Sequence, residues 1–194
     1  MLIELAEYLK CGNDHPEEPL VVATGAMKER AIVFGTIGCP VCKAEYTIVN
    51  RIARFGSPAD PPPPEPSADV EAVQVLLGLT SPGGYLVLLG SAGMLAAGLT
   101  GVMENVHFVA VNPPEQLEPT SYMSLLRGEK YVPLRSAMAR GVVVGAEHAA
   151  APWLDEASRV LLKGQRLVVL REGIEPSGLT KVMAAAGLWA GEKK

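Results

Sequence analysis

The sequence predicts an α/β fold in which a doubly wound, mostly parallel sheet is preceded by a small β module held by a metal ion. Two observations predict it. After residue 68, continuous apolar runs such as 85–89 and 106–111 alternate with segments of helical spacing. Before residue 57, short β-like runs are punctuated by glycines and accompany every cysteine of the chain.

The β module is predicted from residues 20–24, 31–37 and 45–49, which are rich in β-branched residues and separated by glycine-containing turns. These runs indicate a small antiparallel unit. Because they contain too little apolar material for an independent core, we expect a metal ion to stabilise the unit.

A proline-rich segment separates the two parts of the chain. Residues 61–64 are four consecutive prolines, which favour a stiff, extended conformation without backbone donors. We therefore predict a module over 1–56, a linker over 57–67 and a second domain over 68–194. The alternative for the proline segment is a loop that lies on the protein surface.

The second domain is predicted to alternate helices with buried strands. Its first helix is indicated by Val70, Val73, Leu76 and Leu77, which recur at helical spacing. Continuous apolar runs indicate strands that are buried on both faces. The predicted strands are 85–89, 106–111, 141–145, 166–170 and 188–191, and the further helices are 94–102, 117–126, 153–162 and 179–186.

Composition excludes several classes of partner. The net charge is −4 and no cluster of Lys and Arg stands in the sequence, so we expect no nucleic-acid binding. No apolar run approaches the roughly 20 residues that span a bilayer, so we expect no membrane insertion. The acidic start lacks the basic region of a signal peptide. The expected location is the reducing cytoplasm, where cysteines bind metals more often than they form disulfides.

The cysteines and one histidine form a candidate metal-ligand set, Cys11, His15, Cys39 and Cys42. A C-x3-H followed by a C-x2-C suits one tetrahedral zinc ion, and a closed set of four ligands is typical of a structural site. Two alternatives remain open. His15 can be a solvated loop histidine, and the C-x2-C can be a redox pair, although the surrounding β-like runs argue against a thioredoxin-type helix.

The segment that starts at Cys39 and ends at Val49 resembles a zinc-ribbon half-site, in which "C-P-x-C" is followed by a tyrosine and an isoleucine. Similar ribbons occur in the small Trm112-like proteins that support methyltransferases and at the N-terminus of some methyltransferases. The resemblance implies that Cys39 and Cys42 are ligands. This chain departs from the family's second C-x2-C, which Cys11 and His15 would replace.

Residues 153–169 resemble the run "E-A-x-R-V-L-x-x-G-G-x-L-V" of class I S-adenosylmethionine-dependent methyltransferases, with Gln165 in place of the second glycine. Residues 126–134 resemble another segment of that family, which precedes the fourth strand. The similarity covers about residues 68–194 and implies a Rossmann-like domain. Because the chain ends near a sixth strand, we expect a truncated domain in which the usual seventh strand is absent.

The resemblance also implies a cofactor loop at residues 86–94. Gly90, Ser91, Gly93 and Asn112 would line bound S-adenosylmethionine. This chain departs from the family there, because Leu88 replaces an acid. Ala92 and Met94 replace glycines that let the cofactor approach the backbone.

The acid that grips the ribose of the cofactor is likewise replaced, by Asn112. Two functions are therefore weighed. One is a non-catalytic module that binds a protein partner or a small ligand. The other is a genuine S-adenosylmethionine-dependent methyltransferase with an atypical loop, in which Glu147 or His148 faces the substrate as a general base.

Overall fold

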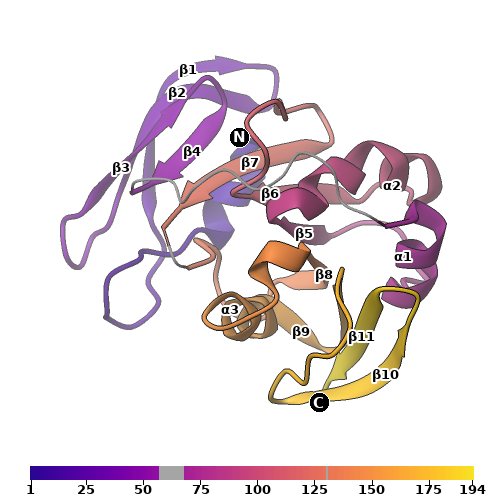
Figure 1. Cartoon of the computed structure of the whole chain (residues 1–194). Helices are drawn as coiled ribbons and strands as arrows, with labels where there is room; N and C mark the ends of the chain where they lie inside the picture. Colours follow the sequence, from indigo (N-terminus) through magenta and orange to yellow (C-terminus); the bar gives the residue numbers. More distant parts are fainter. Residues whose placement is uncertain (57–67, 130) are drawn as a thin grey trace.

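The computed structural model describes residues 1–56, 68–129 and 131–194. In this part of the chain, eleven strands form one mixed sheet in the order β1-β2-β3-β4-β7-β6-β5-β8-β9-β11-β10 (Figure 1). The strands are β1 (Val21–Lys28), β2 (Ala31–Gly38), β3 (Glu45–Val49), β4 (Ile52–Phe55), β5 (Tyr85–Leu89), β6 (His107–Val111), β7 (Met123–Gly128), β8 (Ala139–Val144), β9 (Leu161–Val169), β10 (Leu179–Ala185) and β11 (Leu188–Lys193). The helices are η1 (Ile3–Tyr8), α1 (Val70–Leu77), η2 (Gly90–Leu95), α2 (Ala96–Val102), η3 (Ala146–His148) and α3 (Trp153–Val160).

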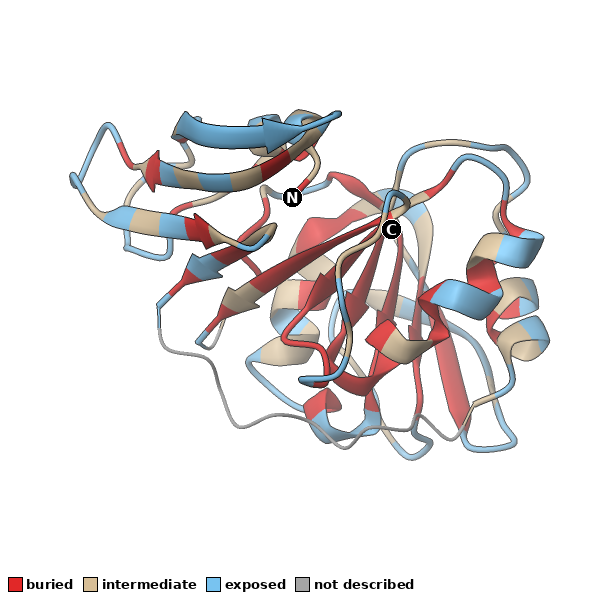
Figure 2. Ribbon diagram, turned by 90° about the horizontal axis from the view of Figure 1, so that it is seen from above, coloured by how far each residue is buried: buried red, intermediate tan, exposed pale blue. Residues whose placement is uncertain are grey.

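The centre of the sheet is parallel and buried on both faces. Strands β4, β7, β6, β5, β8 and β9 pair in parallel in that order. Along β5, Leu86 and Leu88 join an apolar cluster that includes residues of α1 and α2, whereas Val87 and Leu89 join a second cluster with residues of η1 and α3. Figure 2 shows this buried centre in red. The α/β prediction is therefore confirmed.

Strand β7 replaces a predicted helix. The sequence analysis expects a helix over 117–126, but residues 123–128 form a strand between β4 and β6. Within it, Leu125 and Leu126 lie in different apolar clusters, on opposite faces of the sheet. Because these two adjacent residues are both apolar, the sequence shows no alternation with a period of two. The sequence therefore does not distinguish a strand that is buried on both faces from a buried helix.

The C-terminal hairpin corrects one further prediction and confirms another. The expected helix over 179–186 is strand β10, whereas the strand predicted over 188–191 is confirmed as β11, which lies between β9 and β10. The additional strand of the domain is therefore β10. Ala186 and Gly187 both have positive φ, 54° and 78°, in a two-residue turn that pairs Ala185 with Leu188. Such a turn matches the twist of a hairpin and is incompatible with a continuing helix.

The N-terminal strands continue the central sheet. The predicted runs over 20–24, 31–37 and 45–49 are confirmed as β1, β2 and β3. Each of these strands pairs antiparallel with the next one in the chain, so that β3 pairs with β4. Strand β4 then pairs in parallel with β7, from Ile52 opposite Leu125 to Phe55 opposite Gly128. The predicted linker, residues 57–67, lies outside the described residues. Residues before and after it share one apolar cluster.

Polar contacts add to this junction. Glu17 accepts hydrogen bonds from the Ser136 hydroxyl at 2.7 Å and the Ser136 backbone N–H at 3.2 Å. Its carboxylate also lies 3.3 Å from the guanidinium of Arg159 in α3. Burial opposes ionisation of Glu17, but the Ser136 donors and Arg159 hold its pKa below the usual value. These contacts fix the N-terminal segment to Ser136, which lies between β7 and β8, and to helix α3.

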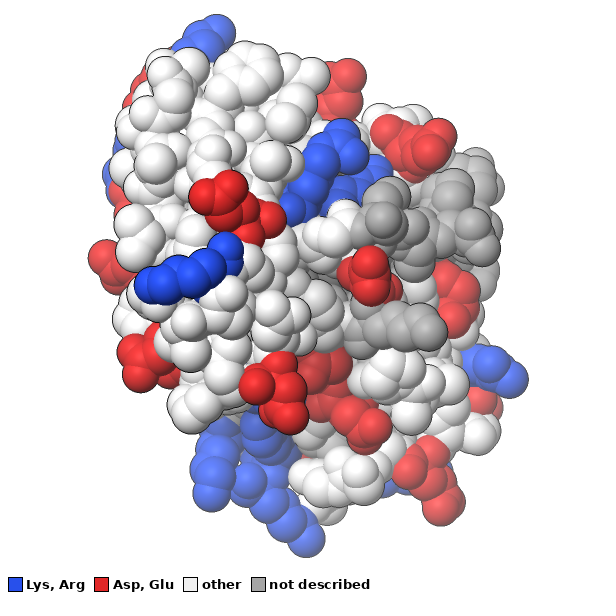
Figure 3. All heavy atoms as spheres, turned by 90° about the vertical axis from the view of Figure 1, so that its left-hand side faces the viewer, with Lys and Arg blue, Asp and Glu red and all other residues white. Residues whose placement is uncertain are grey.

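The outer face of the N-terminal strands is apolar and sparsely charged. Val21, Met27 and Phe34 are 63%, 43% and 45% exposed, and β1 is an edge strand. Figure 3 shows dispersed charges of both signs on this side of the molecule, without a continuous basic stripe. Among the described residues, no helix has both the length and the apolar character needed to cross a bilayer.

We predict that Trp189→Ala lowers the free energy of unfolding by roughly 3–5 kcal/mol, because the indole is buried in β11 at the edge of the parallel strands. Urea denaturation measures this change. Trp189→Phe is the control. Since the indole N–H is buried and has no partner in the part of the chain that the structure describes, the phenyl variant should lose much less. Equal losses in the two variants would contradict this account.

Candidate functional site

The turn after β2 places two of the predicted metal ligands together. The backbone N–H of Cys39 donates to the carbonyl of Ala44 at 2.9 Å, and the N–H of Lys43 donates back to the Cys39 carbonyl at 3.1 Å. Lys43 has a φ of 63°, which closes the turn. Cys39 and Cys42 thereby point to the same side of the hairpin, as the C-x2-C spacing predicts.

The other two ligands come from the segment that follows η1. Leu9 forms an isolated bridge with Leu134, and Lys10 donates its N–H to the carbonyl of Pro133 at 3.2 Å. Gly12 then lies against the ring of Tyr131, where any side chain would collide with the aromatic carbons. This close approach lets Cys11 and His15 reach the β2–β3 turn.

The structure brings together all four predicted ligands. The donor atoms of Cys11, His15, Cys39 and Cys42 lie within 4.8 Å of one another. The Sγ atoms of Cys11 and Cys42 are 3.6 Å apart, and the Nε2 of His15 is 3.3 Å from the Sγ of Cys39. Two thiolates that bind one ion at about 2.3 Å with tetrahedral angles lie about 3.8 Å apart, so the set fits a single metal ion.

Hydrogen bonds orient the ligands. The Nδ1 of His15 lies 2.8 Å from the carbonyl oxygen of Pro16, which can only accept, so Nδ1 carries the proton and Nε2 presents a lone pair to the cluster. The backbone N–H of Gly12 donates to the Tyr46 hydroxyl, which in turn donates to the Sγ of Cys11 at 3.0 Å. This polar support is what second-shell groups supply in metal sites.

Electrostatics favour the ligand form of the exposed thiol. Donation from the Ala44 backbone and then from the Asn13 amide, 3.2 Å away, lowers the pKa of Cys42 to about 6. Burial, and then the bond to Cys11, raises the pKa of Tyr46 to about 12, so its hydroxyl remains a donor. The sequence analysis did not assign roles to Asn13 and Tyr46. Tyr46 belongs to the quoted ribbon motif, whereas Asn13 carried no signal.

The predicted cofactor loop lies at the carboxyl end of β5, but a side chain of the protein covers it. Glu147 accepts hydrogen bonds from the backbone N–H of Ser91 at 2.6 Å and from its hydroxyl at 2.9 Å. A side chain at Gly90 or Gly145 would collide with this carboxylate. Gly90 has a φ of +63°, and Gly93 is buried against Pro113. Glu147, expected to face a substrate, instead closes the turn.

Asn112 is also occupied within the protein. It follows β6, is 2% exposed and has a φ of 48°. Its amide donates to the carbonyl of Gly128 at 2.9 Å, and its Oδ1 accepts from the N–H of Gly128 at the same distance. This reciprocal pair joins the carboxyl ends of β6 and β7, in the manner of a backbone bridge.

Of the remaining histidines, His148 is buried and His107 is half-buried. His148 stacks on Trp153 with ring centroids 4.5 Å apart, and its Nε2 has no partner among the described residues. Its ring lies beside Gly90. At the opposite, amino ends of the strands, the Nε2 of His107 is 2.9 Å from the Ser124 hydroxyl. Burial lowers the pKa of both rings, that of His107 to about 4.

Comparisons with known proteins give structural likenesses only. No known family matches the sequence, and no curated protein does. A solved SAM-dependent methyltransferase from Aquifex aeolicus is 14% identical, with a TM-score of 0.46, over 63% of this chain and 87% of that one. A chain in the complex of the Haloferax volcanii Trm112 methyltransferase activator with a protein described as a methyltransferase is 18% identical, with a TM-score of 0.42, over 52% of this chain and 50% of that one. A protein of Anabaena variabilis, described as a methyltransferase from an antibiotic biosynthesis pathway, is 19% identical, with a TM-score of 0.44, over 52% of this chain and 43% of that one. The chain thus spans half or less of the last two.

We predict that protein purified without added metal contains about one bound ion per chain, measured by elemental analysis. His15→Gln should weaken metal binding at least about tenfold in a competition with a chromophoric chelator, because it removes one of four ligands. His107→Gln, which alters a histidine outside the cluster, is the matched control. If both variants retain metal equally, His15 is not a ligand.

We also predict that stability falls as the pH is lowered from about 6.5 to 4. The unfolded state binds a proton on His107 near its ordinary pKa, whereas burial keeps the folded ring neutral until about pH 4. The loss amounts to at most about 3 kcal/mol for this residue. His148 contributes with the same sign. Chemical denaturation across this range should show a shallower slope for His107→Gln, and an unchanged slope would refute the assignment.

Proposed function

We propose that this protein is a zinc-stabilised, methyltransferase-like module that has lost cofactor binding and acts by binding a partner or small ligand. The zinc ion would be structural, held by Cys11, His15, Cys39 and Cys42. Three thiolates and one imidazole form a soft donor set that suits zinc, and no fifth group is needed for a tetrahedral shell. The elemental analysis described above also identifies the ion.

The methyltransferase-like assignment rests on the quoted motifs and is supported by the order of the parallel strands. The order β7-β6-β5-β8-β9 corresponds to 3-2-1-4-5 of a doubly wound, Rossmann-like sheet. In such sheets, ligands bind at the carboxyl ends of the strands where the order reverses. Here that point lies between β5 and β8, next to Gly90 and Gly145.

A single observation carries the non-catalytic proposal, namely that the carboxylate of Glu147 lies at this reversal point. It takes both donors of Ser91, which a cofactor would otherwise face. The Asn112 amide, the other expected contact, is bonded to Gly128. A cofactor would therefore have to displace one internal anion and break a buried amide pair before it made its own contacts.

The alternative function, a methyltransferase with an atypical loop, is favoured by one observation. Glu147 is exposed and lies on the short helix η3, so its carboxylate can leave Ser91 without unfolding a strand. The left-handed Gly90 turn would then be free to approach a ligand. In that case Glu147 would become available as a base, as the sequence analysis expects.

A calorimetric titration of the metal-loaded chain with S-adenosylmethionine and S-adenosylhomocysteine tests the proposal. We predict no binding at millimolar ligand and no shift in Tm, because the reversal point is filled. Dissociation constants below about 100 µM, which would stabilise the fold measurably, would instead establish the alternative.

Glu147→Ala provides a second arm of this experiment. It removes the internal carboxylate and leaves Asn112 bonded to Gly128. If only this variant binds S-adenosylmethionine, the carboxylate itself is the barrier. Ser136→Ala is the control, because it removes a hydroxyl that donates to a different carboxylate, that of Glu17, outside the reversal point.

A further inference from the structure

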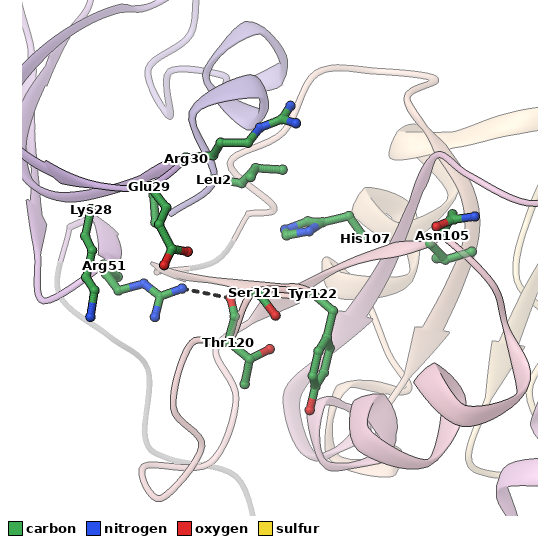
Figure 4. Close-up of a pocket in the computed structure, with 12 residues that line it drawn as sticks. Leu2, Lys28, Glu29, Arg30, Arg51, Asn105, His107, Thr120, Ser121 and Tyr122 are labelled. Carbon is green, nitrogen blue, oxygen red and sulfur yellow. Dashed lines mark hydrogen bonds between the residues drawn. The ribbon is translucent and has the colours of Figure 1, made fainter.

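A pocket of about 610 Å³ lies at the amino ends of the parallel strands, opposite the reversal point. We call it the basal pocket. The N-terminal strands contribute Lys28, Arg30 and Arg51, and the starts of β6 and β7 contribute His107 and Tyr122 (Figure 4). Lys28 and Arg30 flank Glu29 in one turn, and Arg51 lies in the turn of the next hairpin, so the sequence shows no run of basic residues. The fold gathers them around one cavity.

The pocket has an excess of positive charge. Arg30 forms an ion pair with Glu4, and Glu29 is the other acid at the rim. Three cations and two carboxylates leave one positive charge over. Among the described residues, no carboxylate oxygen lies within 4.0 Å of a nitrogen of Lys28 or Arg51. Within the described part of the chain, Lys28 and Arg51 thus have no carboxylate partner, whereas Arg30 is paired with Glu4.

Arg51 is held in an unusual conformation. Asn50 and Arg51 connect β3 to β4 in a two-residue turn, with φ values of 51° and 67°. Glycine is the favoured residue at the second position of such a turn, so an arginine there costs conformational free energy. Its backbone bonds, to the Val33 carbonyl and from the Met1 amine, do not require an arginine side chain.

Two polar atoms at this point have no partner. One guanidinium nitrogen of Arg51 donates to the carbonyl of Thr120 at 2.9 Å, as Figure 4 shows. The Nε of Arg51 and the Oγ1 of Thr120 are both buried without a hydrogen bond among the described residues. Buried polar atoms are nearly always paired in folded proteins, so the unpaired Nε marks the base of the Arg51 guanidinium as an exception among the residues that line the pocket.

We propose that the basal pocket binds a small phosphorylated organic molecule, with its phosphate between Arg51 and Lys28. A phosphate offers several acceptors to the fork of guanidinium N–H donors. The cavity is much larger than a phosphate ion and falls in the range of small-molecule sites. Ser121 and Asn105, which also line the pocket, offer a hydroxyl and an amide for the organic part of the ligand.

Calorimetry on the full, metal-loaded chain tests this site with ribose 5-phosphate, inorganic phosphate and ribose, each against sodium chloride of equal ionic strength. We expect ribose 5-phosphate to bind more tightly than phosphate, and ribose not to bind. Arg51→Gly removes the charge and suits the left-handed turn, so the backbone should be retained. It should weaken ribose 5-phosphate binding at least about tenfold.

Lys28→Gln is a second test that does not depend on the Arg51 turn. Because Lys28 is exposed at the end of β1, its substitution should leave the fold intact, and it should also weaken ribose 5-phosphate binding. Lys181→Gln, the same change on the distant strand β10, should leave binding unchanged. The proposal fails if no heat exceeds that of chloride, if phosphate alone accounts for the affinity, if Arg51→Gly and Lys28→Gln bind as the wild type does, or if Lys181→Gln weakens binding as much as they do. S-adenosylmethionine binding has no part in this outcome, so the two proposals fail independently.

Discussion

The parallel pairing of β4 with β7 is the constraint on which the rest of the structure depends. It converts an N-terminal ribbon, too small to form a core, into the continuation of the central sheet. Ile37 and Phe55 therefore pack in the same buried cluster as Val87 and Trp189. The proposed metal ion would tie residues 11–15 to the turn at 39–42, and its binding free energy would then contribute to the folding free energy of this shared cluster.

Under the proposed function, the carboxyl edge of the sheet keeps the geometry of the fold while its polar groups are used within the protein. The strand order, the left-handed glycine after β5 and the buried apolar strands all remain. The polar groups that would meet a ligand are instead satisfied by the chain itself, through Glu147 on Ser91 and Gly128 on Asn112. Satisfied polar groups stabilise the free protein, and they raise the cost of admitting a ligand by the same amount.

Sequence reasoning succeeded where the determining contacts are local. The C-x2-C turn, the helical spacing of α1 and the strands β1 to β3 depend on residues that are close in the chain. It failed for β7 and β10, which were expected to be helices and whose conformation is decided by neighbouring strands. Leu125 and Leu126 carry no period that distinguishes helix from strand, and the Ala186–Gly187 turn has a non-glycine residue with positive φ that propensity does not anticipate.

The role of Arg51 was beyond sequence analysis for a different reason. Its environment is assembled from the N-terminal hairpins and from the starts of β6 and β7, so no local pattern contains it. The same assembly couples the two proposed ligands of the protein. The basal pocket is complete only when the metal-bound ribbon is joined to the central sheet. An ion at Cys11 and Cys39 and an anion at Arg51 both favour that joined arrangement. To the extent that the unjoined arrangement is populated in the free protein, linkage requires each ligand to strengthen the binding of the other by an equal factor, although their sites share no side chain.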